Sequence, residues 1–293
     1  MSMAALSTDG ITVFAPAKLN LYLHVLGRRD NGYHDLESLV AFADVGDHIA
    51  AAPASNLTLS IDGAFAEDLI DDDENLVLRA ARALQATAGV DAGAALTLTK
   101  NLPVASGIGG GSADAAATIK ALVRLWGIHP ATHDLSGLAL SLGADVPVCL
   151  FGRPAFMTGI GETLEPAPDL PAASLVLINP GLGLSTPDVF KARRGDAGIA
   201  NSFDEPIADA QTLADVLAAR NNDLTAAAIS LAPEIGQVLS VLGGAEGCLL
   251  ARMSGSGATC FGLFADTAAA TAAAAAMRGA HPAWWVVASR LGI

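Results

Sequence analysis

The stretch from residue 103 to residue 113 carries the residue types that most clearly suggest chemistry. Gly107 and the run Gly109–Gly111 lie between a predicted strand and a predicted helix, with Ser112 expected as the N-cap residue of that helix. Glycines let backbone N–H groups turn toward a ligand without a side chain in the way, and a helix start adds unpaired N–H groups and a positive dipole end. This combination favours phosphate binding, although a flexible turn would also explain the glycines.

Two common nucleotide-binding loops do not fit this stretch. A Walker A loop would close with Gly-Lys-Ser or Gly-Lys-Thr, and no such sequence follows Gly111. The Rossmann spacing G-x-G-x-x-G also fails, because Ser112 stands where its last glycine belongs. A phosphate site here would therefore be of another type.

Lys18 and Asp145 are charged residues whose surroundings invite a catalytic interpretation. Around Lys18, leucines alternate with polar residues from position 18 to position 24, which predicts a half-buried strand with its polar side chains on one face. A lysine on such a face is usually just solvated. Asp145 follows a predicted helix that ends at Leu142, where the dipole disfavours an acid, so a functional role is favoured. A carboxylate can accept the proton of a hydroxyl nucleophile or orient that hydroxyl.

The elements that must position these residues form a mixture of strands and helices. Alternation and turn residues predict strands over 11–15, 16–24, 38–45, 56–61, 94–99, 175–178, 248–253 and 259–264, with a turn at 28–32. Val146 precedes Pro147, which favours extended backbone, so a strand is also expected over 146–151. Helix-forming runs predict helices over 75–88, 113–126, 133–142, 210–220, 222–231, 233–242 and 267–277. The acidic run Asp71–Glu74 would open the first of these helices, because acids favour the positive end of the dipole.

The order of these elements indicates the fold class. Strands and helices do not alternate strictly, which favours an α+β fold over a doubly wound parallel sheet. Prolines gather at positions 166, 168 and 171, which indicates a boundary between two domains, residues 1–165 and 166–293.

Composition narrows the possible functions. The 293 residues are 52% hydrophobic and 16% charged, which supports a full globular core. The net charge of −14 disfavours a broad nucleic-acid-binding face, while a small anionic substrate is still allowed. Cys149, Cys248 and Cys260 are too far apart for a zinc knuckle or a redox dithiol.

The N-terminal residues and the hydropathy pattern bear on location. The first ten residues have no cationic segment and no long apolar core, so we expect no signal peptide. No apolar run is long enough for a membrane span. The expectation is a cytoplasmic protein.

Three motifs, which follow one another along the chain in the expected order, resemble those of a known family. The segment Pro103–Ala116 resembles the central signature of the galactokinase–homoserine kinase–mevalonate kinase–phosphomevalonate kinase (GHMP) superfamily, and Pro16-Ala-Lys-Leu-Asn-Leu21 and Ser254-Gly-Ser-Gly-Ala-Thr259 resemble its first and third motifs. Gly32-Tyr-His34 and Gly143-Ala-Asp-Val-Pro-Val148 make the chain similar to the branch that phosphorylates cytidine-diphospho-methylerythritol. The signature often has a second Ser or Thr where this chain has Ala113, which removes one hydroxyl contact to phosphate or magnesium.

The resemblance implies a fold and a reaction. The fold would be a two-domain GHMP kinase fold, with an N-terminal ribosomal-protein-S5-like domain and a C-terminal ferredoxin-like α/β-sandwich domain. The reaction would be the transfer of phosphate from ATP, with Mg²⁺, to the 2-hydroxyl of the cytidine diphosphate derivative. The partner would be this small molecule, with neither nucleic acid nor membrane, and the protein would be a monomer or a weak homodimer.

The resemblance also implies roles for individual residues. Lys18 would lie beside Asp145, the catalytic carboxylate, and stabilise charge on the transferred group. The ATP-binding residues would be Pro103, Val104, Ala105, Ser106, Gly107, Ile108, Gly109, Gly110, Gly111, Ser112 and Ala113, with Asn75 and Lys100 near the adenosine. The substrate-binding residues would be Asn20, which hydrogen-bonds substrate, and Tyr33, His34, Thr186 and Phe190, which enclose the cytidine. No protein ligand of the metal is assigned.

Three alternatives stay open at this point. Another kinase of the superfamily would act on homoserine, mevalonate or a sugar. None of these carries a base that Tyr33 and Phe190 could stack on and His34 could hydrogen-bond. A catalytically inactive nucleotide sensor is disfavoured because both Lys18 and Asp145 are retained. Nucleic-acid binding through a fold shared with ribosomal proteins is disfavoured by the net charge of −14.

Overall fold

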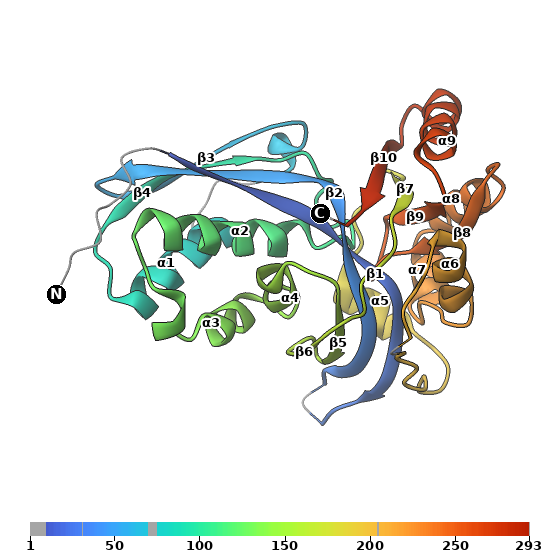
Figure 1. The fold of residues 1–293 in the computed structure, drawn as a ribbon, viewed down its shortest axis with the longest axis horizontal. Helices are drawn as coiled ribbons and strands as arrows, with labels where there is room; N and C mark the ends of the chain where they lie inside the picture. Colours follow the sequence, from blue (N-terminus) through green and yellow to red (C-terminus); the bar gives the residue numbers. More distant parts are fainter. Residues whose placement is uncertain (1–9, 31, 70–74, 204, 293) are drawn as a thin grey trace. The chain divides into compact units, whose positions relative to one another are not determined.

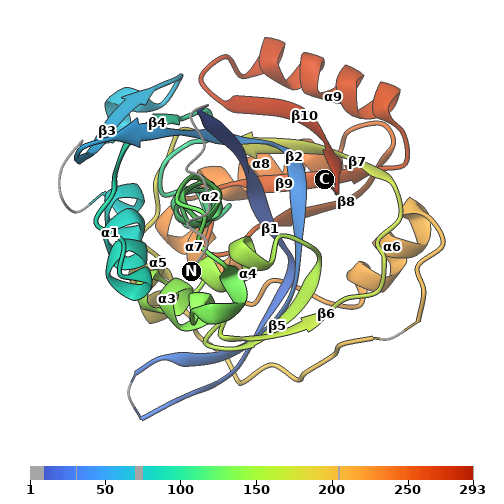
Figure 2. The same ribbon diagram turned by 60° about the vertical axis from the view of Figure 1, so that its left-hand side comes forward.

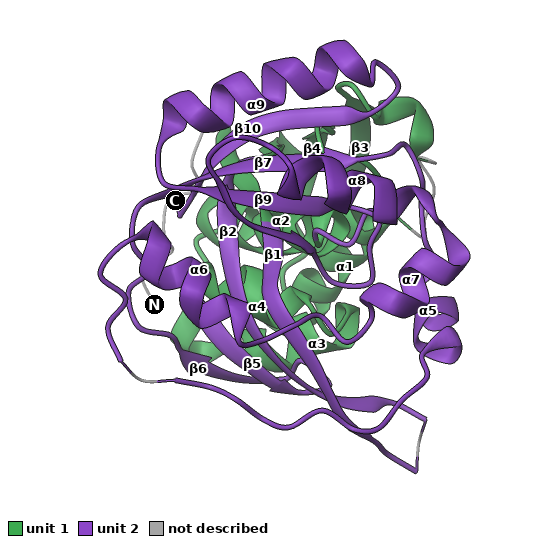
Figure 3. Cartoon of the chain, turned by 90° about the vertical axis from the view of Figure 1, so that its right-hand side faces the viewer, with its two compact units in different colours: residues 1–17, 46–104, 109–152 green, residues 18–45, 105–108, 153–293 purple. Residues whose placement is uncertain are grey.

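The computed structural model describes residues 10–30, 32–69, 75–203 and 205–292. The chain forms two compact units, coloured separately in Figure 3. The first contains residues 1–17, 46–104 and 109–152, and the second contains residues 18–45, 105–108 and 153–293. The predicted boundary at residues 165 and 166 stays a prediction, and the acidic run 71–74 lies outside the described residues.

The first unit contains a small sheet. Strand β2 (His34–Ala54) contributes its later residues, which pair antiparallel with β4 (Gly93–Thr99) from His48↔Thr99 onward. Strand β3 (Leu57–Asp62) runs parallel to β4 on its other edge. Leu96 and Leu98 are buried while the threonines beside them are half-buried, which is the alternation expected of a strand with one face on the core.

Four helices cover one face of this sheet (Figure 1). They are α1 (Leu76–Ala88), α2 (Gly110–Leu125), α3 (Leu135–Leu142) and α4 (Val146–Phe151). Helix α1 buries Val77, Ala80, Ala81 and Leu84, which share one helical face at the spacing i, i+3, i+4, i+7. The predicted helices 75–88, 113–126 and 133–142 are thereby confirmed.

The predicted strand 146–151 is wrong, because these residues form helix α4. The expectation rested on the tendency of a residue before proline to be extended. Pro147 instead stands in the first turn of the helix, where a missing N–H costs nothing, and Gly152 ends the helix in the left-handed region.

The second unit is built on antiparallel strands. Strand β10 (Trp285–Leu291) pairs with β7 (Ala173–Asn179), β7 with β9 (Cys260–Phe264), and β9 with β8 (Cys248–Met253). Strand β5 (Ala155–Gly159) pairs with residues 36–40 of β2 and with β6 (Thr163–Pro166). Every residue of β7 is buried, as expected for a strand covered on both faces.

The second unit also holds the remaining helices. They are α5 (Thr186–Ala192), α6 (Ala210–Ala218), α7 (Thr225–Leu231), α8 (Glu234–Gly243) and α9 (Thr267–Ala280). Helix α9 lies along β10, as Figures 2 and 3 both show. It buries Ala270, Ala274 and Met277 at helical spacing, which confirms the alanine-rich helix. No helix in the described ranges is long and apolar enough to cross a membrane.

Two further expectations need correction. Helix α7 begins at Thr225 rather than at position 222, because the Asn222 side chain accepts a hydrogen bond from Leu224 N at 3.0 Å and holds a turn before the helix. Strand β1 (Ile11–Arg28) is not half-buried near Lys18, since residues 17–25 are buried on both faces. The polar face is covered by partners from distant parts of the second unit, which the alternation of residue types could not reveal.

Candidate active site

The side chain of Lys18 lies in a buried polar group of the second unit. Its Nζ donates a hydrogen bond to Asn20 Oδ1 at 2.8 Å, and the exposed fractions of the two residues are 2% and 1%. Asn20 Nδ2 donates to Ser38 Oγ at 2.8 Å, and the Asn20 backbone N donates to Ser254 Oγ at 3.1 Å. Because β1 alternates in side-chain direction, Lys18 and Asn20 share one face and can meet.

Three sequence motifs come together around Lys18. Lys18 N donates to Ile108 O at 2.9 Å, and Ser254 Oγ donates to Gly107 O at 3.1 Å. Thr259 N donates to Ser106 O at 3.0 Å. The first motif, residues 105–108 of the glycine stretch and the 254–259 motif are therefore held together by hydrogen bonds within one unit.

Gly107 is required by this close approach. Its φ is +75°, in the left-handed region, and a Cβ atom there would lie 2.5 Å from Gly257 O and 2.7 Å from Ser254 O. Both neighbours are backbone atoms, which cannot move aside as a flexible side chain could. Any side chain at this position would therefore push the glycine stretch away from the 254–259 motif.

The later part of the glycine stretch belongs to the first unit and opens α2. The prediction that Ser112 caps this helix is wrong, because the cap residue is Gly109, with φ of 64° and ψ of 21°. Only glycine takes this left-handed conformation without cost, so the helix starts three residues earlier than the serine suggested. The N–H groups of the first turn have no acceptor within the helix and are available to an anion.

Lys100 is buried between two carboxylates under the start of α2. Its Nζ donates to Asp47 Oδ2, and to Asp114 Oδ2 at 2.7 Å. Asp47 Oδ1 accepts from Asn101 N and Leu102 N, whereas Asp114 Oδ1 is buried and has no partner among the described residues. Because its ammonium binds both carboxylates, Lys100 stabilises the backbone at the start of α2. Its predicted contact with adenosine stays a prediction.

The charges in this buried trio shift both pKa values. Burial by itself would lower the pKa of Lys100, but Asp114 and Asp47 outweigh it and raise that pKa. Burial raises the pKa of Asp114 to about 7, with the Lys100 ammonium opposing the shift and Asp47 adding to it. One ammonium thus faces two carboxylates, and Asp114 holds its proton more firmly than an ordinary aspartate.

Asp145 and Asn75 both stand at the start of helices in the first unit. Asp145 is the half-buried residue that precedes α4, and its backbone O accepts from Cys149 N at 3.3 Å. The positive end of the short helix favours its carboxylate. Asn75 caps α1, since its Oδ1 accepts from Val77 N at 3.0 Å. Lys18 and Asp145 belong to different units, and their joint role stays a prediction.

His34 and Phe190 form an aromatic pair in the second unit. Their ring centroids are 4.8 Å apart and their planes are inclined by 21°, so the rings are stacked. Burial, followed by the positive charges of Arg28 and Arg193, lowers the pKa of His34 and favours its neutral form. Tyr33 beside it is 58% exposed.

Thr186 joins α5 to the 254–259 motif. Its Oγ1 and the Ser256 Oγ share a hydrogen bond of 2.8 Å. Thr186 and Phe190 lie on the same short helix, so this contact fixes the helix that carries the aromatic ring.

Comparison with known proteins decides the family. The GHMP kinases N terminal domain model matches residues 75–153, and the GHMP kinases C terminal model matches residues 207–283. A 4-diphosphocytidyl-2-C-methyl-D-erythritol kinase of Paramagnetospirillum magneticum is 56% identical over 96% of this chain and 98% of its own length. The chain belongs to the 4-diphosphocytidyl-2-C-methyl-D-erythritol kinase family of GHMP kinases.

Further relatives support the same family assignment. The 4-diphosphocytidyl-2-C-methyl-D-erythritol kinase of Rhodospirillum rubrum is 53% identical over 97% of this chain and 94% of its own. A crystal structure of a 4-(cytidine 5'-diphospho)-2C-methyl-D-erythritol kinase superposes with a TM-score of 0.79 at 36% identity, covering 97% of this chain and 100% of its own. A homoserine kinase from Cytophaga hutchinsonii matches in fold alone, with a TM-score of 0.72 at 20% identity. The expected two-domain α+β kinase fold and ATP-dependent kinase class are thereby confirmed.

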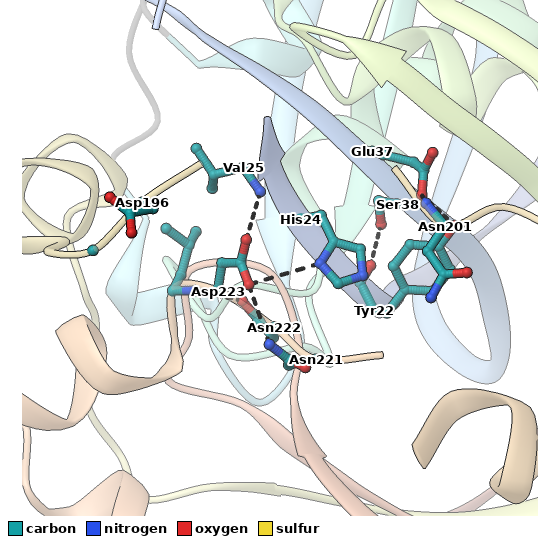
Figure 4. Close-up of polar contacts among 12 residues, drawn as sticks. Tyr22, His24, Val25, Glu37, Ser38, Asp196, Asn201, Asn221, Asn222 and Asp223 are labelled. Atoms are coloured by element: carbon teal, nitrogen blue, oxygen red, sulfur yellow. Dashed lines mark hydrogen bonds and ion pairs between the residues drawn. The ribbon is translucent and has the colours of Figure 1, made fainter. Parts of the chain in front are cut away.

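A buried cluster of charged residues fixes the segment that follows α5 in this kinase. Asp223 Oδ2 accepts from Val25 N at 2.9 Å, and Asp223 Oδ1 lies 3.7 Å from His24 Nδ1 (Figure 4). Arg193, directly after α5, places a guanidinium nitrogen 3.8 Å from Asp223 Oδ2. Because Phe190 lies one turn before Arg193, Asp223 helps to hold the His34–Phe190 pair.

A second anchor holds the same segment a few residues later. Glu37 Oε1 accepts from Asn201 N at 2.6 Å and from Tyr22 OH at 3.1 Å. Arg220 donates to Asn201 O at 2.6 Å and lies over the Phe203 ring. Burial, then the Glu37 carboxylate, raise the pKa of Tyr22, so its hydroxyl stays a donor.

Several of these supporting residues were not predicted from the sequence. Four residues that hold other residues of the site in place are Ser38, Asp47, Asp114 and Asp223. The sequence indicated each of them only as part of a strand, a helix or a loop. The nearest signal was the presence of Asp114 inside the glycine signature. The partners of the others lie far away in the chain, so spacing alone offered no indication.

Proposed function

We propose that the protein transfers the terminal phosphoryl group of ATP to the 2-hydroxyl of 4-diphosphocytidyl-2-C-methyl-D-erythritol, in the non-mevalonate synthesis of isoprenoid precursors. The observation that carries this proposal is 56% identity, over 96% of the chain, to a kinase named for that substrate. The stacked His34–Phe190 pair supports it, because a cytosine ring needs a flat aromatic partner.

The transfer itself needs a base and a positive charge. Asp145 would orient the acceptor hydroxyl and take its proton as the oxygen attacks the terminal phosphorus of ATP. The bond from that phosphorus to the bridging oxygen breaks, and ADP leaves. Lys18 would stabilise negative charge on the transferred group, and its link to Asn20 supports this role by fixing the ammonium in a buried position.

The phosphates of ATP would bind along the glycine stretch. The N–H groups in the first turn of α2 have no acceptor within the helix, and Gly110 carries no side chain to block them. The Ser112 hydroxyl, on the third residue of the helix, adds one more donor. These features support ATP binding by residues 103–113, with Asn75 and Lys100 further along the nucleotide.

Mg²⁺ would enter with the nucleotide. Enzymes that use ATP commonly let the phosphates and water provide most of the coordination of this ion, with one or two carboxylates from the protein. Because Asp145 is proposed to take the proton of the acceptor hydroxyl, no protein ligand of the ion is assigned, and the phosphates and water would provide its coordination. When bound, Mg²⁺ neutralises charge on the phosphates.

The cytidine would be recognised in the second unit. The neutral form of His34, favoured by its lowered pKa, can donate or accept a hydrogen bond at the edge of the base. Tyr33 is exposed and would close over the ring, opposite Phe190. Thr186 would contact the substrate near Ser256. Since both substrates are small metabolites, we propose that the enzyme works in the cytoplasm as a monomer or a weak homodimer.

An assay across acceptors tests the function. ADP release is measured with ATP, Mg²⁺ and either the cytidylyl substrate, homoserine or mevalonate, and we expect turnover with the first alone. Turnover with mevalonate or homoserine and none with the cytidylyl substrate would overturn the proposal and favour another kinase of the superfamily.

A further inference from the structure

The hydroxyl of Ser38 is fully buried beside Asn20 and is not part of the proposed chemistry. We propose that Ser38 is a positioning residue, which fixes the orientation of the Asn20 amide and thereby the Lys18 ammonium. The inference rests on the proposed function, because Lys18 matters to turnover only if the enzyme transfers phosphate.

Counting protons shows how Ser38 acts. A serine hydroxyl has a single proton and can accept with its lone pairs. Ser38 Oγ donates that proton to Tyr22 O at 2.6 Å, as Figure 4 shows, so it can only accept from Asn20 at 2.8 Å. The group of Asn20 that faces Ser38 must therefore be its NH₂, and the carbonyl oxygen must face Lys18.

The contact on the other side of Asn20 demands the same orientation. An ammonium group only donates hydrogen bonds, so Lys18 Nζ requires the Asn20 oxygen at 2.8 Å. The Asn20 backbone is itself held by Ser254 Oγ at 3.1 Å. Asn20 thus has no freedom to exchange its oxygen and nitrogen while Ser38 is in place.

Burial makes the Ser38 oxygen difficult to replace. Ser38 is 0% exposed and Asn20 is 1% exposed, so bulk water does not reach the contact. Without the hydroxyl, the NH₂ group of Asn20 would be buried without an acceptor, which is unfavourable. Rotation of the amide would relieve this, but it would turn NH₂ toward the Lys18 ammonium and replace one of its acceptors with a donor.

The expected result is a loss of turnover and not of ATP binding. We expect Ser38→Ala to lower kcat by about ten- to hundredfold, the range for losing a hydrogen bond that supports a charged group. The KM for ATP should stay within about twofold, because the ATP-binding residues are not touched. Ser38→Thr keeps the hydroxyl on a strand position and should restore kcat.

A double-mutant cycle separates positioning from a general structural role. If Ser38 acts through Asn20, then Ser38→Ala should lower kcat far less in the Asn20→Ala background than in the wild type. The matched control is Ser174→Ala, which removes another buried hydroxyl of the second unit, paired with Thr267 at 3.1 Å, and should leave kcat unchanged. Equal losses in both backgrounds, or an equal loss in the control, would overturn the inference.

Two further measurements keep the test decisive. Should Ser38→Ala fold poorly, Ser38→Cys keeps the size while offering only a weak acceptor, and full activity in that variant would overturn the inference. A neutron structure of Ser38→Ala or Ser38→Cys, which locates the amide hydrogens, needs no turnover: an Asn20 NH₂ group turned toward Lys18, or an amide moved away from it, supports the inference, and an unchanged amide orientation overturns it. Wild-type enzyme that is inactive toward the cytidylyl substrate would instead count against the proposed function.

Discussion

Replacing Asp114 with asparagine should change how the stability of the protein depends on pH. The variant keeps the shape of the side chain but removes the second carboxylate from the Lys100 ammonium. In the folded wild type the pKa of Asp114 is raised from 3.8 to about 7, mainly by burial. The folded protein therefore keeps a proton that the unfolded chain releases between about pH 4 and pH 7.

The sign and size follow from this difference in bound protons. Where the folded state binds one proton more than the unfolded state, the free energy of unfolding falls by about 1.4 kcal/mol for each unit of rising pH. Between pH 5 and pH 7 the wild type should therefore lose about 2 kcal/mol relative to Asp114→Asn, since the loss levels off near the folded pKa. Above pH 8 the difference should stay constant.

Urea unfolding of both proteins at pH 5, 6, 7 and 8 measures this difference. Asp44→Asn is the matched control. Burial opposes the shift, but hydrogen bonds from Ser289 and Arg290 outweigh it and lower the pKa of Asp44. Asp44 is thus ionised in both states throughout this range, and its difference from the wild type should not vary with pH. A flat difference for Asp114→Asn would refute the reasoning, because it would mean that Asp114 is already charged at pH 5.

Three further predictions concern activity. Asp145→Asn should bind ATP almost normally when binding is measured by calorimetry. Its kcat should fall by about 10²- to 10⁴-fold, the usual contribution of a general base. Unchanged turnover would show that Asp145 is not part of the mechanism. Phe190→Leu removes the stack on His34 and should raise the KM for the cytidylyl substrate by about three- to tenfold with the KM for ATP unchanged, so equal changes in both KM values would contradict a nucleobase role. Asp223→Ala should likewise raise only the KM for the cytidylyl substrate, because Arg193 after α5 loses its anchor, and a variant with wild-type kinetics would show that the anchor is dispensable.

Much of the fold could be predicted because local signals agreed with the tertiary structure. Helix α9 consists largely of alanine, the strongest helix former, and β4 alternates leucine with threonine. Strand β10 was not predicted, because Trp285–Leu291 has no clear alternation of apolar and polar residues. Helix α5 was missed as well, since its seven residues are too few to show a helical period.

The site was predictable where a motif carried it and not where a distant partner did. Lys18, Asn20, the glycine stretch and His34 stand in recognisable motifs, and residues 105–108 and 254–259 do lie together. The polar side chains of β1 were expected to face solvent, because nothing in the local sequence shows that Ser38, Glu37 and Asp223 cover them. Gly109 displaced Ser112 as the helix cap because backbone conformation decided the helix start.

The pairing of β10 bears on how the protein is made. This last strand runs along β7 from Trp285↔Asn179 to Leu291↔Ala173, and Leu291 also pairs with Ala43 on β2. A ribosome delivers residue 43 long before residue 291, so one edge of β7 stays open until residues 285–291 have been made. A nascent chain stalled before residue 285 would therefore expose an apolar strand edge of the kind that chaperones bind.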